Sequence, residues 1–176
     1  MDSKYYRNWH LASNEMEYKI TEFEWSIIRC YEAFARWVTT ANSVMVDGDI
    51  KFSEYNILQV IRMVDRPKSG QIIARMINRD DIANVQYSLR KLESVGLIKK
   101  VRDPGGKMQA YEVTDKGRSV TDEFAKMRSE LLVESLKTVD KLEERIVGAT
   151  HLLSVFTGIY EEVSRSSAAL SHSIQD

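Results

Sequence analysis

Residues 81–118 read DIANVQYSLRKLESVGLIKKVRDPGGKMQAYEVTDKGR, and this stretch decides the fold. It opens with an amphipathic helix, because apolar side chains recur there at spacings of three and four residues: Ile82, Val85, Leu89 and Leu92. Asp81 is expected to cap the start of this helix, since its carboxylate can accept from free backbone N–H groups. Gly96 suits the left-handed residue that ends a helix.

Two short strands, LIKKV and AYEVT, follow that helix and are joined by DPGGK. Gly105 and Gly106 supply the positive φ angles that a hairpin turn needs. Thr114 is expected to cap a further helix that opens at Asp115. The order helix, strand, glycine turn, strand predicts a winged helix, a unit that commonly places one helix in a DNA major groove beside a basic hairpin.

The charge of the chain is concentrated around this stretch. Residues 66–118 contain 12 Lys and Arg but 6 Asp and Glu, a net charge of +6, whereas the whole chain has a net charge of −1. The remaining residues therefore carry −7. A basic block in an otherwise acidic protein is the pattern expected of a site for a polyanion, although a solvated basic surface is the simpler alternative.

Composition narrows the class of protein. A chain of 176 residues with 43% hydrophobic side chains can build a globular core. A single cysteine, Cys30, allows no intramolecular disulfide and favours a reducing cytoplasm. No signal peptide or membrane span is expected. The three histidines are scattered without metal-ligand spacing and no phosphate-binding loop is evident, so we expect no enzyme, metal or cofactor.

Helices are predicted over most of the remaining chain, at 17–45, from Ser53 to about Val64, and at 70–77, 115–137 and 140–164, with a frayed tail. The helices at 70–77 and from Asp81 form a helix-turn-helix. The expected fold is mainly α with a small β-hairpin wing. We divide it into an N-terminal arm and dimerisation helix (1–50), a winged helix-turn-helix (51–114) and C-terminal dimerisation helices (115–176).

Broad apolar stripes on the flanking helices predict a two-fold homodimer. On 17–45 the stripe is Ile20, Phe23, Ile27, Cys30/Tyr31, Phe34, Val38, Ala41 and Met45. That is more apolar surface than one short domain needs from a single helix. A larger monomeric bundle that buries these stripes internally is the alternative. A two-fold dimer would set two recognition helices roughly 10 base pairs apart on one face of DNA.

The polar face of the helix after Asp81 supplies the candidate DNA contacts. We expect the base-reading side chains to be Asn84, Gln86, Tyr87 and Ser88, since Asn and Gln can bond bidentately to adenine. Contacts with the DNA backbone and from the wing are expected from Arg75, Arg90, Lys91, Lys99, Lys100, Arg102 and Lys107. An exposed helix face is polar by default, so ordinary solvation is the alternative for each of them.

A second candidate site lies among the aromatic side chains of the N-terminal helix. Tyr31, Phe34, Trp37 and Tyr55, together with Cys30, would suit a cleft for a flat aromatic or phenolic effector. Two other interpretations stay open. The aromatic residues can be plain dimer core, and a cysteine on an apolar stripe usually acts as a small hydrophobe rather than a redox sensor.

Two segments resemble the MarR family of bacterial winged-helix regulators: KLESVGLIKKVRDPGGK at 91–107 and VTDKGRSVTDEFAKMRSELL at 113–132. The resemblance covers roughly 52–135. It implies a homodimeric, operator-binding regulator, by default a repressor, often released from DNA by phenolic ligands or thiol oxidation. The chain departs from the family pattern in the wing, where Lys107 replaces the usual arginine, and in the recognition helix. The operator therefore cannot be carried over.

The expected function is thus a sequence-specific transcriptional regulator that binds double-stranded DNA as a homodimer on a pseudo-palindromic operator, with release by a small aromatic ligand as a further expectation. The alternatives are a winged-helix module for protein interaction and an architectural DNA-binding module without effector response. Salt dependence separates the first alternative from DNA binding, because phosphate contacts weaken steeply as ionic strength rises.

Overall fold

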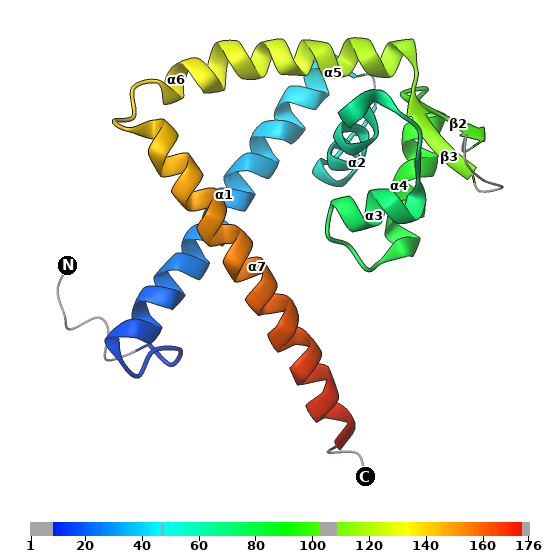
Figure 1. Cartoon of the computed structure of the whole chain (residues 1–176). Coiled ribbons are helices and arrows are strands. Elements are labelled where there is room, and N and C mark those ends of the chain that lie inside the picture. Colours follow the sequence, from blue (N-terminus) through cyan, green and yellow to red (C-terminus); the bar gives the residue numbers. More distant parts are fainter. Residues whose placement is uncertain (1–8, 47, 103–108, 174–176) are drawn as a thin grey trace. The chain divides into compact units, whose positions relative to one another are not determined.

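The computed structural model describes residues 9–46, 48–102 and 109–173. These residues are mainly helical and include a three-stranded antiparallel sheet (Figure 1). The chain divides into two compact units, Met1–Lys126 and Met127–Asp176. The predicted division into three parts, at residues 50 and 114, is based on function rather than on compactness and stays a prediction.

The first unit holds the predicted winged helix. Its helices are α1 (Glu15–Met45), α2 (Phe52–Arg62), η2 (Met63–Asp65), α3 (Gly70–Met76), α4 (Ile82–Ser94) and all but the end of α5 (Asp115–Met127). Its strands are β1 (Lys68–Ser69), β2 (Ile98–Arg102) and β3 (Gln109–Val113). The second unit contains the π-helical segment η3 (Arg128–Val133), α6 (Glu134–Leu136) and the long α7 (Leu142–Ser173).

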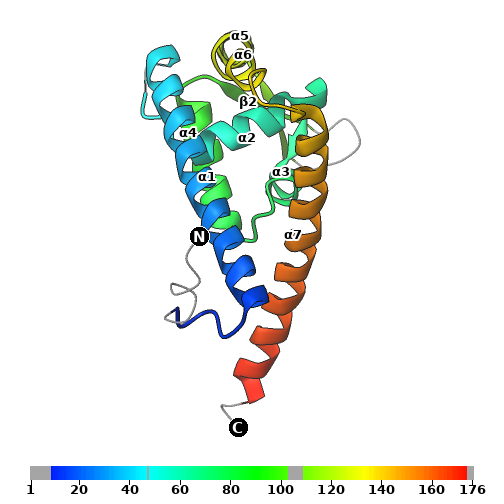
Figure 2. The ribbon, with the colours of Figure 1, turned by 90° about the vertical axis from the view of Figure 1, so that its left-hand side faces the viewer.

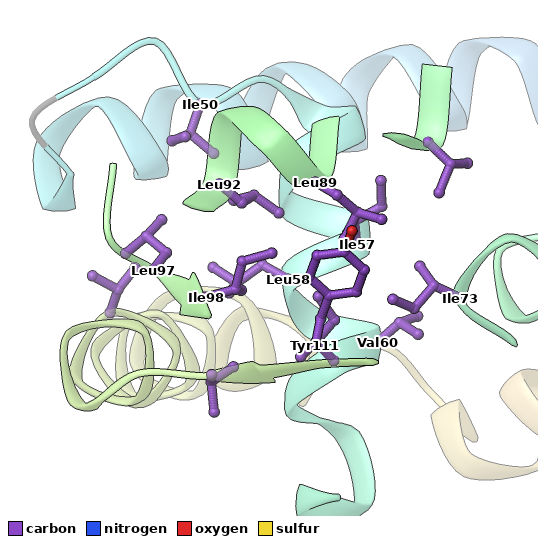
Figure 3. Close-up of a cluster of buried hydrophobic side chains, with 14 of the residues drawn as sticks. Ile50, Ile57, Leu58, Val60, Ile73, Leu89, Leu92, Leu97, Ile98 and Tyr111 are labelled. Carbon is purple, nitrogen blue, oxygen red and sulfur yellow. The ribbon is translucent and has the colours of Figure 1, made fainter. Parts of the chain in front are cut away.

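The core of the first unit lies between the helices and the sheet. Strand β3 is central, with β1 and β2 paired on either side of it. Helix α2 packs against both α1 and α4, and Figure 2 shows it next to α1. Figure 3 shows Leu58, Leu89 and Tyr111 converging from α2, α4 and β3, and all three are buried. Val85, Leu89 and Leu92 of the stripe predicted on α4 therefore face this core.

The predicted helix ends around α4 are confirmed. The Asp81 carboxylate accepts from the backbone N–H of Asn84 at 3.0 Å. Gly96 has a φ of 75°, the left-handed conformation that glycine adopts without steric cost. The Thr114 hydroxyl accepts from the backbone N–H of Gly117 at 3.0 Å and so caps α5. The Gly105–Gly106 turn lies outside the described residues.

Helix α2 differs from the prediction at both ends. It begins at Phe52 rather than at Ser53, and the Glu54 carboxylate accepts from the backbone N–H of Lys51, its N-cap residue, at 3.0 Å. It ends at Arg62 rather than at about Val64, which is 71% exposed with a φ of 63°. The apolar periodicity of the sequence extends beyond Arg62, but the chain leaves the helix at that residue.

A buried lysine explains where α2 ends. The Lys68 ammonium donates to the backbone carbonyls of Ile61 and Arg66, each at 3.1 Å, and also to that of Met63. These carbonyls belong to the last turn of α2 and the segment after it, which lack helical N–H partners. A cation at a helix C-terminus is also favoured by the helix dipole. Sequence alone gave no signal for this cap.

Two further expectations were wrong, the burial of Ile82 and the frayed tail. Ile82 is 44% exposed and does not belong to the buried stripe. It is the first residue of α4 and lies beyond the edge of the core. Residues 165–173, expected to belong to a frayed tail, are helical because α7 continues to Ser173. The predicted apolar stripe on α1 is buried at Val38 and Ala41 and half exposed at Tyr31 within the single chain, and its burial against a second chain stays a prediction.

Gly117 gives a test of the packing that holds α5 to the wing. A Cβ at Gly117 would lie 2.1 Å from the carbonyl oxygen of Leu97, far inside contact distance. We therefore expect Gly117→Ala to lower the free energy of unfolding by about 3 kcal/mol, the upper end for overpacking in a core. The measurement is urea unfolding followed by circular dichroism.

Gly148→Ala is the matched control. A Cβ at that helical position meets no described atom within 4 Å, so alanine should be neutral or stabilising by up to about 1 kcal/mol. If Gly117→Ala behaved like Gly148→Ala, the close approach of α5 to Leu97 would be wrong.

Candidate nucleic-acid interface

Helices α3 and α4 form the predicted helix-turn-helix. The hydroxyl of Ser69 accepts from the backbone N–H of Ile72 at 3.3 Å and caps α3. The turn passes through Asn78, whose φ of 53° is a left-handed conformation that asparagine tolerates better than most residues. Helix α4 then starts at its Asp81 cap, which places its first turns on the surface.

The outward face of α4 carries some of the predicted base readers but not all. Asn84 is exposed, and its side-chain amide donates to the second oxygen of Asp81. Tyr87 is 59% exposed, and Arg90 lies on the same face one turn later. Gln86 is half-buried, with its amide over the bare Cα of Gly70. The exposed surface of α4 is therefore centred on Tyr87.

Ser88 and Lys91 were expected on this outward face, and that expectation was wrong. Ser88 is 4% exposed, and its hydroxyl donates to Glu54 of α2 at 2.8 Å. The Lys91 ammonium lies 3.5 Å from the same carboxylate and donates to the backbone carbonyl of Asp49. Their polar character suggested exposure, but a buried acid on another helix provides their partners.

The predicted cations fall into two groups. The lysines are paired: Lys99 lies 2.9 Å from Glu112, and Lys100 lies 2.6 Å from Glu93. The hydrogen bond with Glu93 raises the pKa of Lys100 above its usual value. The exposed arginines that were expected to contact DNA have no carboxylate partner within the described part of the chain: Arg75, Arg90 and Arg102. Lys107 lies outside the described residues.

A surface hollow of about 430 Å³ lies between α3 and the start of α4. Arg75 and Arg79 both line it, together with the polar side chains of Gln71, Asn78 and Asp80. Sequence reasoning counted Arg79 in the basic block but gave it no role, although its place in the turn between two short helices was a usable signal. Two guanidinium groups and two amides outnumber the single carboxylate of Asp80, so the hollow suits an anionic group such as a phosphate.

The aromatic side chains predicted for the effector site do come together, in one aromatic cluster formed by α1, α2 and α5. Its members are Tyr31, Phe34, Trp37, Phe52, Tyr55 and Phe124. The ring centroids of Phe34 and Phe52 are 5.3 Å apart, and those of Tyr55 and Phe124 are 4.8 Å apart. Trp37 reaches Phe124 at 5.3 Å, and Tyr31 meets Phe52 at 5.4 Å. The sequence analysis did not include Phe52 and Phe124 in this site. Cys30, which it did include, is exposed.

Known proteins share this architecture. Residues 51–117 match the family model described as a winged helix DNA-binding domain. The transcriptional regulator BldR from Sulfolobus solfataricus is 22% identical, with a TM-score of 0.64, over 80% of this chain and 98% of that one. A MarR mutant from E. coli in complex with operator DNA is 16% identical, with a TM-score of 0.64, over 81% and 99%.

A MarR-family transcription regulator is 11% identical to this chain, with a TM-score of 0.63, and the match covers 86% of this chain and 99% of that one. The fold is that of MarR-family regulators. No curated protein matches the sequence. The family model describes a DNA-binding domain, and the solved structures named above are of transcription regulators. None of the described helices is long and apolar enough to cross a membrane.

The division between paired lysines and unpaired arginines gives a testable difference. We expect Arg90→Ala to reduce the slope of log affinity for DNA against log salt concentration by about 0.9, the value for one lost phosphate contact. Lys99→Ala is the control with equal loss of charge, and it should change the slope less because Glu112 already neutralises that ammonium. Equal changes in slope for the two variants would contradict this division.

Proposed function

We propose that this MarR-like chain is a sequence-specific transcriptional regulator that binds double-stranded DNA as a homodimer on a pseudo-palindromic operator, with repression as the default outcome. The observation that carries the proposal is the exposed face of α4. It presents Asn84 and Tyr87 to solvent beside Arg75, Arg79 and Arg90, which have no carboxylate partners among the described residues. Base readers flanked by free cations are what a recognition helix requires.

Each group has a role in the proposal. Asn84 and Gln86 read base edges, and Tyr87 contacts a thymine methyl group or a phosphate. Backbone contacts come first from Arg75, Arg90 and Arg102, and the paired Lys99 and Lys100 contribute less. Ser88 and Lys91 are left out because both are committed to Glu54. For Lys107 of the wing, contact with DNA stays a prediction.

Exposed apolar side chains support the homodimer. On α1, Met16 is 67% exposed and Ile28 is 48% exposed. On α7, Val147 is 70% exposed and Val163 is 55% exposed. Long helices with so many exposed aliphatic groups usually bury them against a partner, and a two-fold dimer is the commonest way to do so. The N-terminal arm and helix (1–50) and the C-terminal helices (115–176) are thus the proposed dimerisation parts, on either side of the DNA-binding domain (51–114).

The aromatic cluster is the proposed place for a small aromatic or phenolic effector. Tyr31 and Phe34 are 50% and 41% exposed, so the cluster is open to solvent at its α1 side within the single chain. Flat ligands bind by offset or edge contacts with such rings. The same exposure also favours the competing interpretation, in which the rings are plain dimer core. Measuring whether a ligand binds distinguishes the two interpretations.

The experiment that tests the proposal measures binding of the purified protein to its own upstream intergenic DNA and to a scrambled duplex at two salt concentrations. We expect tight, salt-sensitive preference for the former with two chains per duplex. Equal affinity for both duplexes would favour an architectural role, and no binding at either salt would favour a protein-interaction module.

Asn84 provides the test of base reading. We expect Asn84→Ala to cost about 1–3 kcal/mol at one base position of the operator and to leave binding to the scrambled duplex unchanged. Competition binding on a set of single-base operator variants measures this. Equal losses on operator and scrambled DNA would remove Asn84 from the base-reading face.

The aromatic cluster and Cys30 are tested together. A phenolic probe such as salicylate should quench tryptophan fluorescence and release the operator, and Trp37→Leu should weaken both effects because it removes one ring of the cluster. Cys30→Ser should leave the phenol response intact. If Cys30→Ser abolished release by peroxide while the phenol had no effect, the exposed thiol would be the sensor instead.

A further inference from the structure

The carboxylate of Glu54 connects two helices that both belong to the DNA-binding unit. Glu54 lies in the first turn of α2 and is 3% exposed. One of its oxygens accepts from the Ser88 hydroxyl at 2.8 Å and from the Ser53 hydroxyl at 3.1 Å. The other accepts from the backbone N–H of Lys51 at 3.0 Å and lies 3.5 Å from the Lys91 ammonium. Two of these partners, Ser88 and Lys91, are on α4.

The carboxyl stays ionised in spite of its burial. Burial by itself would raise the pKa of Glu54, but hydrogen bonds from Ser88, Lys51 and Ser53 together with the charge of Lys91 hold that pKa below its usual value. A buried charge is strongly unfavourable unless donors surround it. Here the donors come from both α2 and α4, so the two helices must keep their relative positions to satisfy it.

This polar contact restrains α4 in a way that its apolar contacts do not. Aliphatic side chains such as Leu89 and Leu92 hold a helix against the core, but their contacts are non-directional and tolerate small rotations. A hydrogen bond weakens steeply when its angle or distance changes. Ser88 lies one turn after Asn84, so the bond to Glu54 fixes the rotation of the same turns that carry the proposed base readers.

The same turn of α2 also reaches the aromatic cluster. Phe52 contacts both Tyr31 and Phe34 of α1, and Tyr55 contacts Phe124 of α5. Glu54 lies between Phe52 and Tyr55 in the sequence. A change in the packing of these rings therefore acts on the turn that holds the carboxylate.

We propose that Glu54 is the positioning residue of the recognition helix, and that the first turn of α2 transmits changes in the aromatic cluster to α4 through the hydrogen bond between Glu54 and Ser88. The proposal rests on the proposed DNA-binding function for its consequence, namely operator preference. Its structural content, the restraint on α4, is independent of any DNA.

The first test uses Ser88→Ala, which removes one hydroxyl and leaves the Glu54 carboxylate with its other donors. Amide hydrogen exchange of residues 82–94 is measured on the DNA-free protein, and affinities are measured for operator and scrambled duplexes. We expect exchange in α4 to rise about tenfold and operator preference to fall about tenfold, as for loss of one charge-assisted hydrogen bond. Glu54→Gln should retain more of the preference than Glu54→Ala, because its amide oxygen still accepts from Ser88.

Thr121→Val is the matched control. It removes another buried hydroxyl, one that donates to the carbonyls of Gly117 and Arg118 within α5, and it keeps the shape of the side chain. We expect it to leave exchange in α4 and operator preference unchanged. If Ser88→Ala and Thr121→Val had equal effects after correction for melting temperature, the positioning role would be overturned.

The second test is a double-mutant cycle between Phe52→Leu and Ser88→Ala. Phe52→Leu disturbs the aromatic cluster and should raise exchange in α4 severalfold when Ser88 is present, but should add little to Ser88→Ala. Additive effects would overturn transmission through this bond. If the unaltered protein showed no operator preference, the proposed function would fail, yet the exchange measurements would still decide for or against the restraint by Glu54.

Discussion

The close contact around Leu97 is the constraint on which the rest of the DNA-binding unit depends. Its backbone N–H donates to the carbonyl of Leu92 at 3.0 Å, and its own carbonyl accepts from Thr114 at 3.1 Å. The Thr114 hydroxyl also donates to the carbonyl of Gly96 at 2.6 Å. The end of α4, the start of β2, the end of β3 and the start of α5 therefore meet at one point. Only glycine fits at residue 117, because the Leu97 carbonyl occupies the space of a side chain.

This junction holds the C-terminal end of α4 and leaves its N-terminal half to be positioned by other contacts. Apolar side chains press that half onto the core, and Ser88 attaches it to the buried carboxylate of Glu54. The recognition helix is thus held at one end by backbone hydrogen bonds and along its length by the polar contacts of Ser88 and Lys91 with Glu54. The exposed face with Tyr87 is a consequence of this arrangement, since the other faces of α4 are occupied.

The positive charge that the DNA-binding unit can offer to a ligand depends on which of its cations already have a carboxylate partner. The paired lysines of the hairpin and α4 stabilise the fold locally, and their charges are partly neutralised before any ligand arrives. Arg75, Arg90 and Arg102 remain exposed, with no carboxylate partner in the described segments. The planar guanidinium group offers two parallel N–H donors to a phosphate, which an ammonium cannot. Within the basic block, these three arginines therefore offer free guanidinium groups, whereas the paired lysines also stabilise the fold.

The sequence by itself determined the winged helix, because its signals are local. Capping by Asp81 and Thr114, the left-handed Gly96 and the apolar spacing on α4 each act within a few residues and were confirmed. Tertiary structure decided the rest: it buried Ser88 against Glu54, and it ended α2 with the ammonium of a lysine from beyond the helix. It also gathered rings from three helices into one cluster. The contact of Ser88 with Glu54 and the contacts among the rings join partners far apart in the chain. The Lys68 cap is shorter in range, but it needs the chain to fold back onto the end of α2. No periodicity or local propensity records which residue will arrive beside a given side chain.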